Sequence, residues 1–135
     1  MTDMVQFGQD LRMLLDGKQA VRISVGGYMP LSVEQIGHDA DGHALIAMSH
    51  TSIQNGDLMR DPEMVFALHQ HAEAVMAEPI EFRNDYMGVR QEVFEYDANG
   101  HRTHIRPRLK KELLAFARAW FQNLRDQGFF DPHAK

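Results

Sequence analysis

The sequence predicts an α+β fold in which an antiparallel sheet of five to seven strands is flanked by an N-terminal helix and a longer C-terminal helix, both packed on one face. Three observations predict it. Apolar residues recur with helical spacing near the two ends of the chain. Between them, apolar and polar residues alternate and are interrupted by short turn signals. The intervening segments leave no room for the crossovers that a parallel sheet requires.

The length of 135 residues fits a single domain, which we expect to span residues 1–135. The absence of cysteine excludes disulfide bonds, thiolate metal sites and a cysteine nucleophile. No apolar run approaches the roughly 18–20 residues that a membrane span needs. Asp3 and Asp10 lie where a secretory signal would carry a basic start and an apolar centre. We therefore expect a soluble cytoplasmic protein.

Both predicted helices have an apolar face and a glycine after the last turn. The first is predicted over 3–16 and ends at Gly17. The second is predicted over 108–127 and ends at Gly128. Its apolar stripe consists of Leu109, Leu113, Phe116, Ala117, Trp120, Phe121 and Leu124. We expect the two aromatic residues that follow Gly128 to dock on this chain or on a partner.

The strands are predicted between these helices. Their segments are 20–25, 31–37, 43–50, 63–69, 80–85, 88–97 and 101–105. The second and third segments form the clearest hairpin, and Ala98-Asn99-Gly100 predicts the turn of another. No internal repeat is found.

Several parts of this pattern leave alternatives open. Residues 63–69 are also good helix formers, and 70–77 fits either a short helical turn or a loop. The stretch 51–62 is polar and turn-rich. A parity switch after Val93 predicts a bulge, or a strand covered on both faces. Thr103 and Ile105 face inward in one possible register of the last strand.

Polar side chains of functional type are densest at 50–63 and again at 83–86. Binding groups are commonly placed on loops held by a rigid scaffold, so these segments predict a binding surface. Asn and Asp also form turns, and arginine pairs with neighbouring acids, which is the structural alternative. The candidate binding residues are His50, Gln54, Asn55, Asp57, Arg60, Asp61, Arg83, Asn84, Asp85 and Tyr86.

Charge is unevenly distributed around the net value of −5. Residues 57–97 contain ten acids and three bases, whereas 101–111 contain five bases and no acid. The basic patch comprises Arg102, Arg106, Arg108, Lys110 and Lys111. It could contact phosphates, an acidic partner or a second copy, or it could simply be solvated.

The sequence carries no recognisable catalytic motif, since it lacks a nucleophile elbow, a phosphate-binding loop and a dinucleotide fingerprint. His69 and His71 share one strand face and, with His50 and a nearby carboxylate such as Asp57, could hold zinc or iron. No third ligand follows at a telling spacing. We therefore expect no metal, no cofactor and no catalytic residue.

Two runs, QNGDLMRDPEMVF at 54–66 and EPIEFRNDYMGVRQEVF at 78–94, resemble those of a family of small uncharacterised domains. The family occurs in phages, conjugative plasmids and integrated elements. The resemblance covers about 45 central residues and not the terminal helices. It implies an accessory role in a mobile element and no particular reaction.

The favoured function is a non-enzymatic binding or regulatory protein of a mobile element, with a protein partner or a second copy. The acidic 57–97 segment favours an alternative, an inhibitor that imitates DNA. Direct nucleic-acid binding through the basic patch and a metal-dependent hydrolase are the remaining possibilities. No membrane role is expected.

Overall fold

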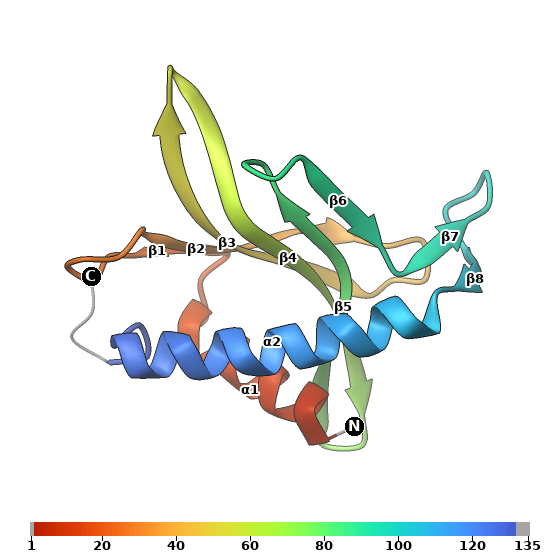
Figure 1. Ribbon diagram of the computed structural model, residues 1–135. Helices are drawn as coiled ribbons and strands as arrows, with labels where there is room; N and C mark the ends of the chain where they lie inside the picture. The colour runs from red at the N-terminus through yellow and green to blue at the C-terminus, as the bar shows by residue number, and fades with distance from the viewer. Residues whose placement is uncertain (1, 132–135) are drawn as a thin grey trace.

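Figure 1 shows a computed structural model of the chain, which describes residues 2–131. The helices and strands of this part follow one another as α1 (Thr2–Leu15), β1 (Ala20–Ile23), β2 (Leu31–His38), β3 (Ala44–Gln54), β4 (Asp57–His71), β5 (Ala74–Asn84), β6 (Val89–Glu92), β7 (Phe94–Tyr96), β8 (Arg102–Ile105) and α2 (Pro107–Gln127).

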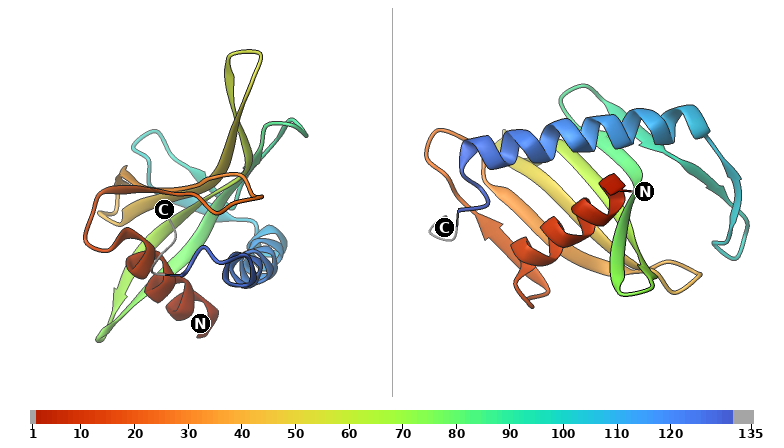
Figure 2. Two further views of the ribbon diagram at one scale, coloured as in Figure 1. Left: turned by 90° about the vertical axis from the view of Figure 1, so that its left-hand side faces the viewer. Right: turned by 90° about the horizontal axis from the view of Figure 1, so that it is seen from below.

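The first six strands form one antiparallel sheet in which every strand pairs with its sequence neighbour. Strands β7 and β8 form a separate hairpin. Both helices lie against the same face of the large sheet (Figure 2). The predicted α+β class, with its antiparallel sheet and flanking helices, is confirmed. Neither described helix is long and apolar enough to cross a membrane.

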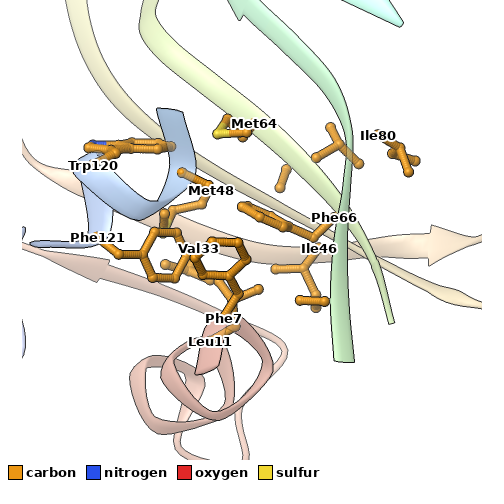
Figure 3. Packing of buried hydrophobic residues seen from close by; sticks show 14 of the residues in the cluster. Phe7, Leu11, Val33, Ile46, Met48, Met64, Phe66, Ile80, Trp120 and Phe121 are labelled. Carbon is orange, nitrogen blue, oxygen red and sulfur yellow. The ribbon is translucent and has the colours of Figure 1, made fainter. Parts of the chain in front are cut away.

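The core lies between this face and the two helices (Figure 3). The ring of Phe7 from α1 lies 4.9 Å from that of Phe121 in α2 and 6.1 Å from that of Phe66 in β4. Phe66 and Phe121 are 5.8 Å apart, so the three rings join both helices to the sheet. Such aromatic pairs add to the free energy gained by burying their area.

Helix α1 approaches the sheet closely because residue 8 is glycine. A Cβ atom at Gly8 would lie 2.1 Å from the carbonyl oxygen of Val75 in β5. Any side chain here would push the helix away from the sheet.

Helix α2 confirms the most regular pattern in the sequence. It begins at Pro107, and Gly128 follows it in the left-handed conformation with φ 97°. Five of the seven stripe residues are buried, while Leu109 is partly buried and Phe116 is 38% exposed. Phe129 is 1% exposed, so the aromatic pair after the helix docks on its own chain.

The predicted hairpins are also confirmed. β2 pairs with β3, and β7 with β8. Asn55 and Gly56, with φ 52° and 84°, form the tight turn between β3 and β4. Two central residues with positive φ match the twist of a hairpin.

In the centre of the chain, the strand predicted at 63–69 is confirmed, one expectation is wrong and two open alternatives are excluded. The polar stretch 51–62 is not a turn-rich connection, because β3 and β4 extend through it as a hairpin. The helical alternative for 63–69 and the helical turn within 70–77 fail too, because β4 runs to His71 and β5 starts at Ala74. Residues with good helix propensity form a strand here because β4 pairs with both β3 and β5, and this pairing buries Met64 and Phe66 completely, at 0% exposure.

The segment 88–97 is two strands in two different sheets rather than one. The chain leaves β6, passes through the buried Val93 and enters β7, so the parity switch marks the change of sheet. The register irregularity of the β7–β8 pair comes later, between Glu95 and Tyr96. The inward register for Thr103 and Ile105 is also wrong, since both side chains are exposed. Strand β8 instead directs Arg102 inward, with its guanidinium 3.9 Å from the ring centre of Phe94.

Candidate functional site

The candidate binding residues of the QNGD run lie on a hairpin that stands out from the sheet. We call residues 51–60 the arm; it is the tall hairpin that joins β3 and β4 at the top of Figure 1. Gln54, Asn55 and Asp57 lie exposed at its tip. The register shifts between Ser49 and Thr51, so the strands carry an irregularity where the arm begins. Such a bulge bends and twists a hairpin, which accounts for the change of direction.

A second group of candidate residues fastens the base of the arm to the turn after β5. Asp85 accepts a hydrogen bond from the Arg60 N–H at 2.8 Å and one from Arg83 Nε at 2.7 Å. Asn84 donates to the carboxylate of Asp61 at 2.7 Å and accepts from the Met87 N–H. We call Arg60, Asp61, Arg83, Asn84 and Asp85 the arm joint. The two sequence runs of the resemblance therefore meet in space.

Electrostatics at the joint follow from this bonding. Burial alone would raise the pKa of Asp85, but the hydrogen bonds from Arg60 and Arg83 and their positive charges hold it below its usual value. The neighbouring Glu63, 2.9 Å from Arg60 Nε, has a raised pKa because burial outweighs the charges of Arg60 and Arg83. The joint is therefore a network of ion pairs and hydrogen bonds within the chain.

The remaining two candidates, Tyr86 and His50, do not belong to the arm joint. The hydroxyl of Tyr86 lies 2.6 Å from that of Ser52, so it adds a tie between the turn and the arm. His50 is not at the surface: it is 8% exposed and packs against Trp120 and Phe129. Its Nδ1–H donates to the carbonyl oxygen of Met29 at 3.0 Å.

The face of the sheet opposite the helices carries a hollow of about 580 Å³. We call it the outer groove. It is lined by side chains of β1, β2, β3 and β4, among them Arg22, Ser32, Glu34, Ile36, Ala47, Ser49, Thr51, Leu58, Arg60 and Glu63. Arg22, Ser32, Ser49 and Glu63 are register neighbours and form one row across it. Its floor is made of small buried residues, whereas Ile36 and Leu58 are 47% and 48% exposed.

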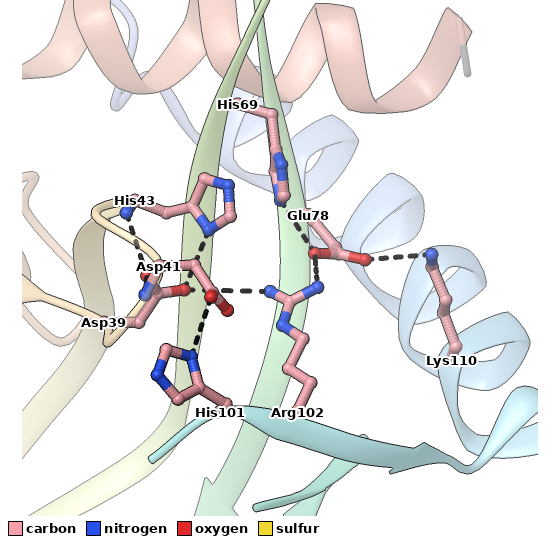
Figure 4. A network of polar contacts seen from close by, with 8 residues as sticks. All are labelled: Asp39, Asp41, His43, His69, Glu78, His101, Arg102 and Lys110. Carbon is pink, nitrogen blue, oxygen red and sulfur yellow. Dashed lines mark hydrogen bonds and ion pairs between the residues drawn. The ribbon is translucent and has the colours of Figure 1, made fainter. Parts of the chain in front are cut away.

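A cluster of ionisable groups brings together β4, β5, the β2–β3 turn, the β7–β8 hairpin and the start of α2 (Figure 4). At its centre is Glu78 of β5, which is 6% exposed. Its carboxylate lies 2.9 Å from His69 Nε2, from Arg102 Nη1 and from Lys110 Nζ. Burial alone would raise the pKa of Glu78, but Lys110 and Arg102 outweigh it and lower the pKa.

Two turns of the same design complete this cluster. In residues 39–43, Asp39 accepts hydrogen bonds from the N–H groups of Asp41 and His43. In residues 97–101, an aspartate accepts the equivalent bonds from the residues two and four positions later. The turns lie against each other, with His101 Nδ1 2.9 Å from Asp41 Oδ1 and Arg102 Nη2 4.0 Å from Asp39 Oδ2.

Sequence reasoning missed this cluster, although a signal was present. Residues 39–43 read D-A-D-G-H and residues 97–101 read D-A-N-G-H. This five-residue similarity is too short to indicate a repeat architecture, but it identifies two turns of one kind. Both serve the same local purpose, a hairpin turn closed by an aspartate, and they meet because their hairpins are neighbours.

The structure separates the histidines that sequence reasoning grouped for a metal site. His50 lies in the core beside Trp120. His69 instead packs against His43, with ring centres 4.0 Å apart and ring planes tilted by 41°. The side chain of His71 lies outside the described part of the structure. Asp57 is at the arm tip, so these residues do not form one site.

The basic patch is largely used within the chain. Arg102 and Lys110 bind Glu78, and Arg106 lies 3.3 Å from Glu95. Arg108 and Lys111 are exposed and form no ion pair within residues 2–131. Five of the ten acids of 57–97 likewise pair with arginine or lysine, namely Glu63, Glu78, Glu81, Asp85 and Glu95.

Comparison with known proteins gives a family but no activity. No curated protein and no solved structure matches the chain. A family model described as Domain of unknown function (DUF6908) matches residues 3–130. The match includes both terminal helices, so it extends well beyond the central runs. The chain therefore belongs to this family of domains of unknown function.

Proposed function

We propose that the chain is a non-enzymatic binding protein that holds a segment of a partner protein in the outer groove. The observation that carries this proposal is that the two faces of the sheet differ: one is covered by the helices and the other is open. Both helices cover one face. The other face is hollow and exposes apolar side chains, Ile36 and Leu58, on opposite sides of β3. A concave surface that combines apolar side chains with a few polar groups is typical of binding sites.

The charges around the groove favour a polypeptide over a nucleic acid. Arg22 and Arg60 are matched by Glu34 and Glu63, so the lining has no net positive charge. Nucleic-acid sites instead gather lysine and arginine on one surface. A peptide segment with an apolar centre and charges of both signs would complement the groove.

The arm joint supports this role by holding one wall of the groove. Leu58 and Arg60 belong to the arm, whose base is fastened through Asp61, Asn84 and Asp85. A wall fixed before binding reduces the entropy lost on association. The resemblance to phage and plasmid proteins supports a regulatory role in a mobile element, in the cytoplasm. A second copy of the chain could supply the bound segment.

Photo-crosslinking tests the proposal. A crosslinking amino acid is placed at Ile36 or at Leu58 in cells of the native host, and at the exposed Ala119 of α2 as a control. We expect both groove positions to capture the same protein, and Ala119 not to capture it. The double variant Ile36→Asp/Leu58→Asp should lose that protein while keeping its melting temperature. Equal capture from Ala119, or capture unchanged by the double variant, would contradict the proposal. Light scattering of the purified chain shows whether the partner is a second copy.

A further inference from the structure

Beyond the groove, the junction of the two turns brings together the donor atoms of a metal site. We propose that Asp39, Asp41, His43 and His101 bind one divalent transition-metal ion of the zinc type. The first three residues come from the turn between β2 and β3, and His101 comes from the turn between β7 and β8. The ion would join two hairpins that belong to different sheets.

The distances between donor atoms suit a single ion. Donor atoms of Asp39, Asp41 and His43 all lie within 4.8 Å of one another. Asp39 Oδ2 lies 2.9 Å from His43 Nδ1, and Asp41 Oδ1 lies 2.9 Å from His101 Nδ1. Ligands bound about 2.0–2.2 Å from one ion lie roughly 3–4 Å from each other. Asp39, Asp41 and His43 are therefore close enough to share an ion, whereas His101 adjoins this group through Asp41 and must move further to reach the same ion.

The charges around the junction leave room for a cation. Two carboxylates meet there, and their nearest side-chain partners are imidazoles, which are neutral unless protonated. The nearest permanent positive charge is Arg102, 4.0 Å from Asp39. Arg102 is held more closely by Glu78, at 2.9 Å (Figure 4). Asp41 raises the pKa of His101, so a proton balances part of the negative charge in the metal-free chain. A bound divalent ion would replace that proton, because a ligating imidazole nitrogen is unprotonated.

The kind of donor selects the kind of metal. Imidazole nitrogen suits zinc, copper, nickel and iron, whereas calcium and magnesium prefer oxygen ligands. A set of two carboxylates and two imidazoles thus favours a transition metal. The other groups that face the site are Arg102 and the ring of His69, which stacks on His43.

Calorimetric titration of the chelator-treated full chain with Zn²⁺ tests the site. We expect one ion per chain, and no comparable heat with Mg²⁺ or Ca²⁺. His43→Ala and His101→Ala should each weaken zinc binding by more than about tenfold. Even the loss of a residue that only hydrogen-bonds to a metal ligand typically weakens binding by about that factor. His104→Ala is the matched control, because this exposed histidine of β8 pairs with Glu95 and lies outside the donor set. It should bind zinc like the parent chain.

A folding defect is separated from ligand loss in two ways. Every variant is first checked for its metal-free melting temperature. Asp41→Asn is a milder change, because Asp41 is exposed and its side chain forms a hydrogen bond only with His101 among the described residues. It should also weaken zinc binding. Absence of zinc binding, equal binding of Ca²⁺, or binding unchanged by His101→Ala would each overturn the proposal. In those cases the junction is an ordinary pair of ion-paired turns.

Discussion

Arg60 and Asp85 are joined by three contacts at the base of the arm. The Arg60 N–H donates to Asp85 Oδ2 at 2.8 Å, and the Asp85 N–H donates to the Arg60 carbonyl oxygen at 2.8 Å. The Arg60 guanidinium lies 3.5 Å from the same carboxylate. The side chain of Asp85 is 14% exposed, so water competes little for these bonds. The β5–β6 turn thereby fixes a hairpin that would otherwise depend on its own two strands.

Replacing Asp85 with alanine should lower the free energy of unfolding by about 1–3 kcal/mol, because the Arg60 N–H and two guanidinium groups lose an acceptor. Urea unfolding measures this loss. Amide hydrogen exchange should become faster across residues 51–60. Asp57→Ala is the matched control: Asp57 is exposed at the arm tip, so its removal should change stability by less than about 0.5 kcal/mol. Equal effects of the two variants would show that the joint does not hold the arm.

The sequence predicts those parts of the fold that rest on local signals. Helix α2 has a wide apolar stripe and a glycine stop, and the hairpin turns place Asn55, Gly56 and Gly100 at positive φ, which these residue types accept. Each signal acts within a few residues. The element type therefore does not depend on the rest of the fold.

The extent of the arm could not be predicted in this way. The stretch 51–62 lacks the alternation of a strand with one buried face, because both faces of the arm are partly exposed. Its strands form because β3 and β4 continue their pairing beyond the core. The division of 88–97 between two sheets also depends on tertiary packing, since the change of sheet occurs at the buried Val93.

The candidate site was predicted in part. The 50–63 and 83–86 segments do come together, yet most of their polar side chains bind one another. His50 belongs to the core instead. The cluster around Glu78 draws on five segments spread over residues 39–110, and the repeated turn was its one local signal. Ion pairs between distant segments leave no mark on residue spacing.

Gly8→Ala should be among the most damaging single-methyl additions to this chain. The new Cβ would lie 2.1 Å from the backbone carbonyl oxygen of Val75, so α1 must move off the sheet. Overpacking of this kind costs about 1–3 kcal/mol, which thermal or urea unfolding detects. Gly26→Ala is the control, because nothing lies within 4 Å of its added methyl group. A stability loss of similar size in the control would contradict the close approach of α1 to β5.

Glu78→Gln should destabilise the chain by about 1–3 kcal/mol, the cost of leaving hydrogen-bonding groups without their partner. Arg102 and Lys110 would then face each other without a carboxylate, although both keep some access to water. The double variant Glu78→Gln/Lys110→Met should regain part of this loss, since it removes one uncompensated charge. Unfolding curves of the parent chain and both variants test this. If Lys110→Met lowers the stability of the Glu78→Gln variant as much as it lowers that of the parent chain, Lys110 and Glu78 do not interact.

His50 should make stability fall as the pH drops below about 6.5. Burial lowers the pKa of its imidazole below the usual 6.5, and the hydrogen bonds to the carbonyl groups of Pro30 and Met29 only partly oppose this. The unfolded chain therefore takes up a proton at a pH where the folded chain does not. The contribution of His50 is complete above pH 6.5 and is lost as the pH falls from there toward the folded pKa.

The measurement is the free energy of unfolding against pH for the parent chain and for His50→Asn. The asparagine amide can still donate to the Met29 carbonyl oxygen but cannot titrate, so the difference between the two curves isolates the imidazole. We expect that difference to change by up to about 1.4 kcal/mol per pH unit between pH 6.5 and the folded pKa, and to be constant above. NMR titration of the ring gives an independent value. A midpoint at or above 6.5 would mean that water reaches His50 behind Trp120 and Phe129, and that the packing of α2 on β3 is looser than the structure shows.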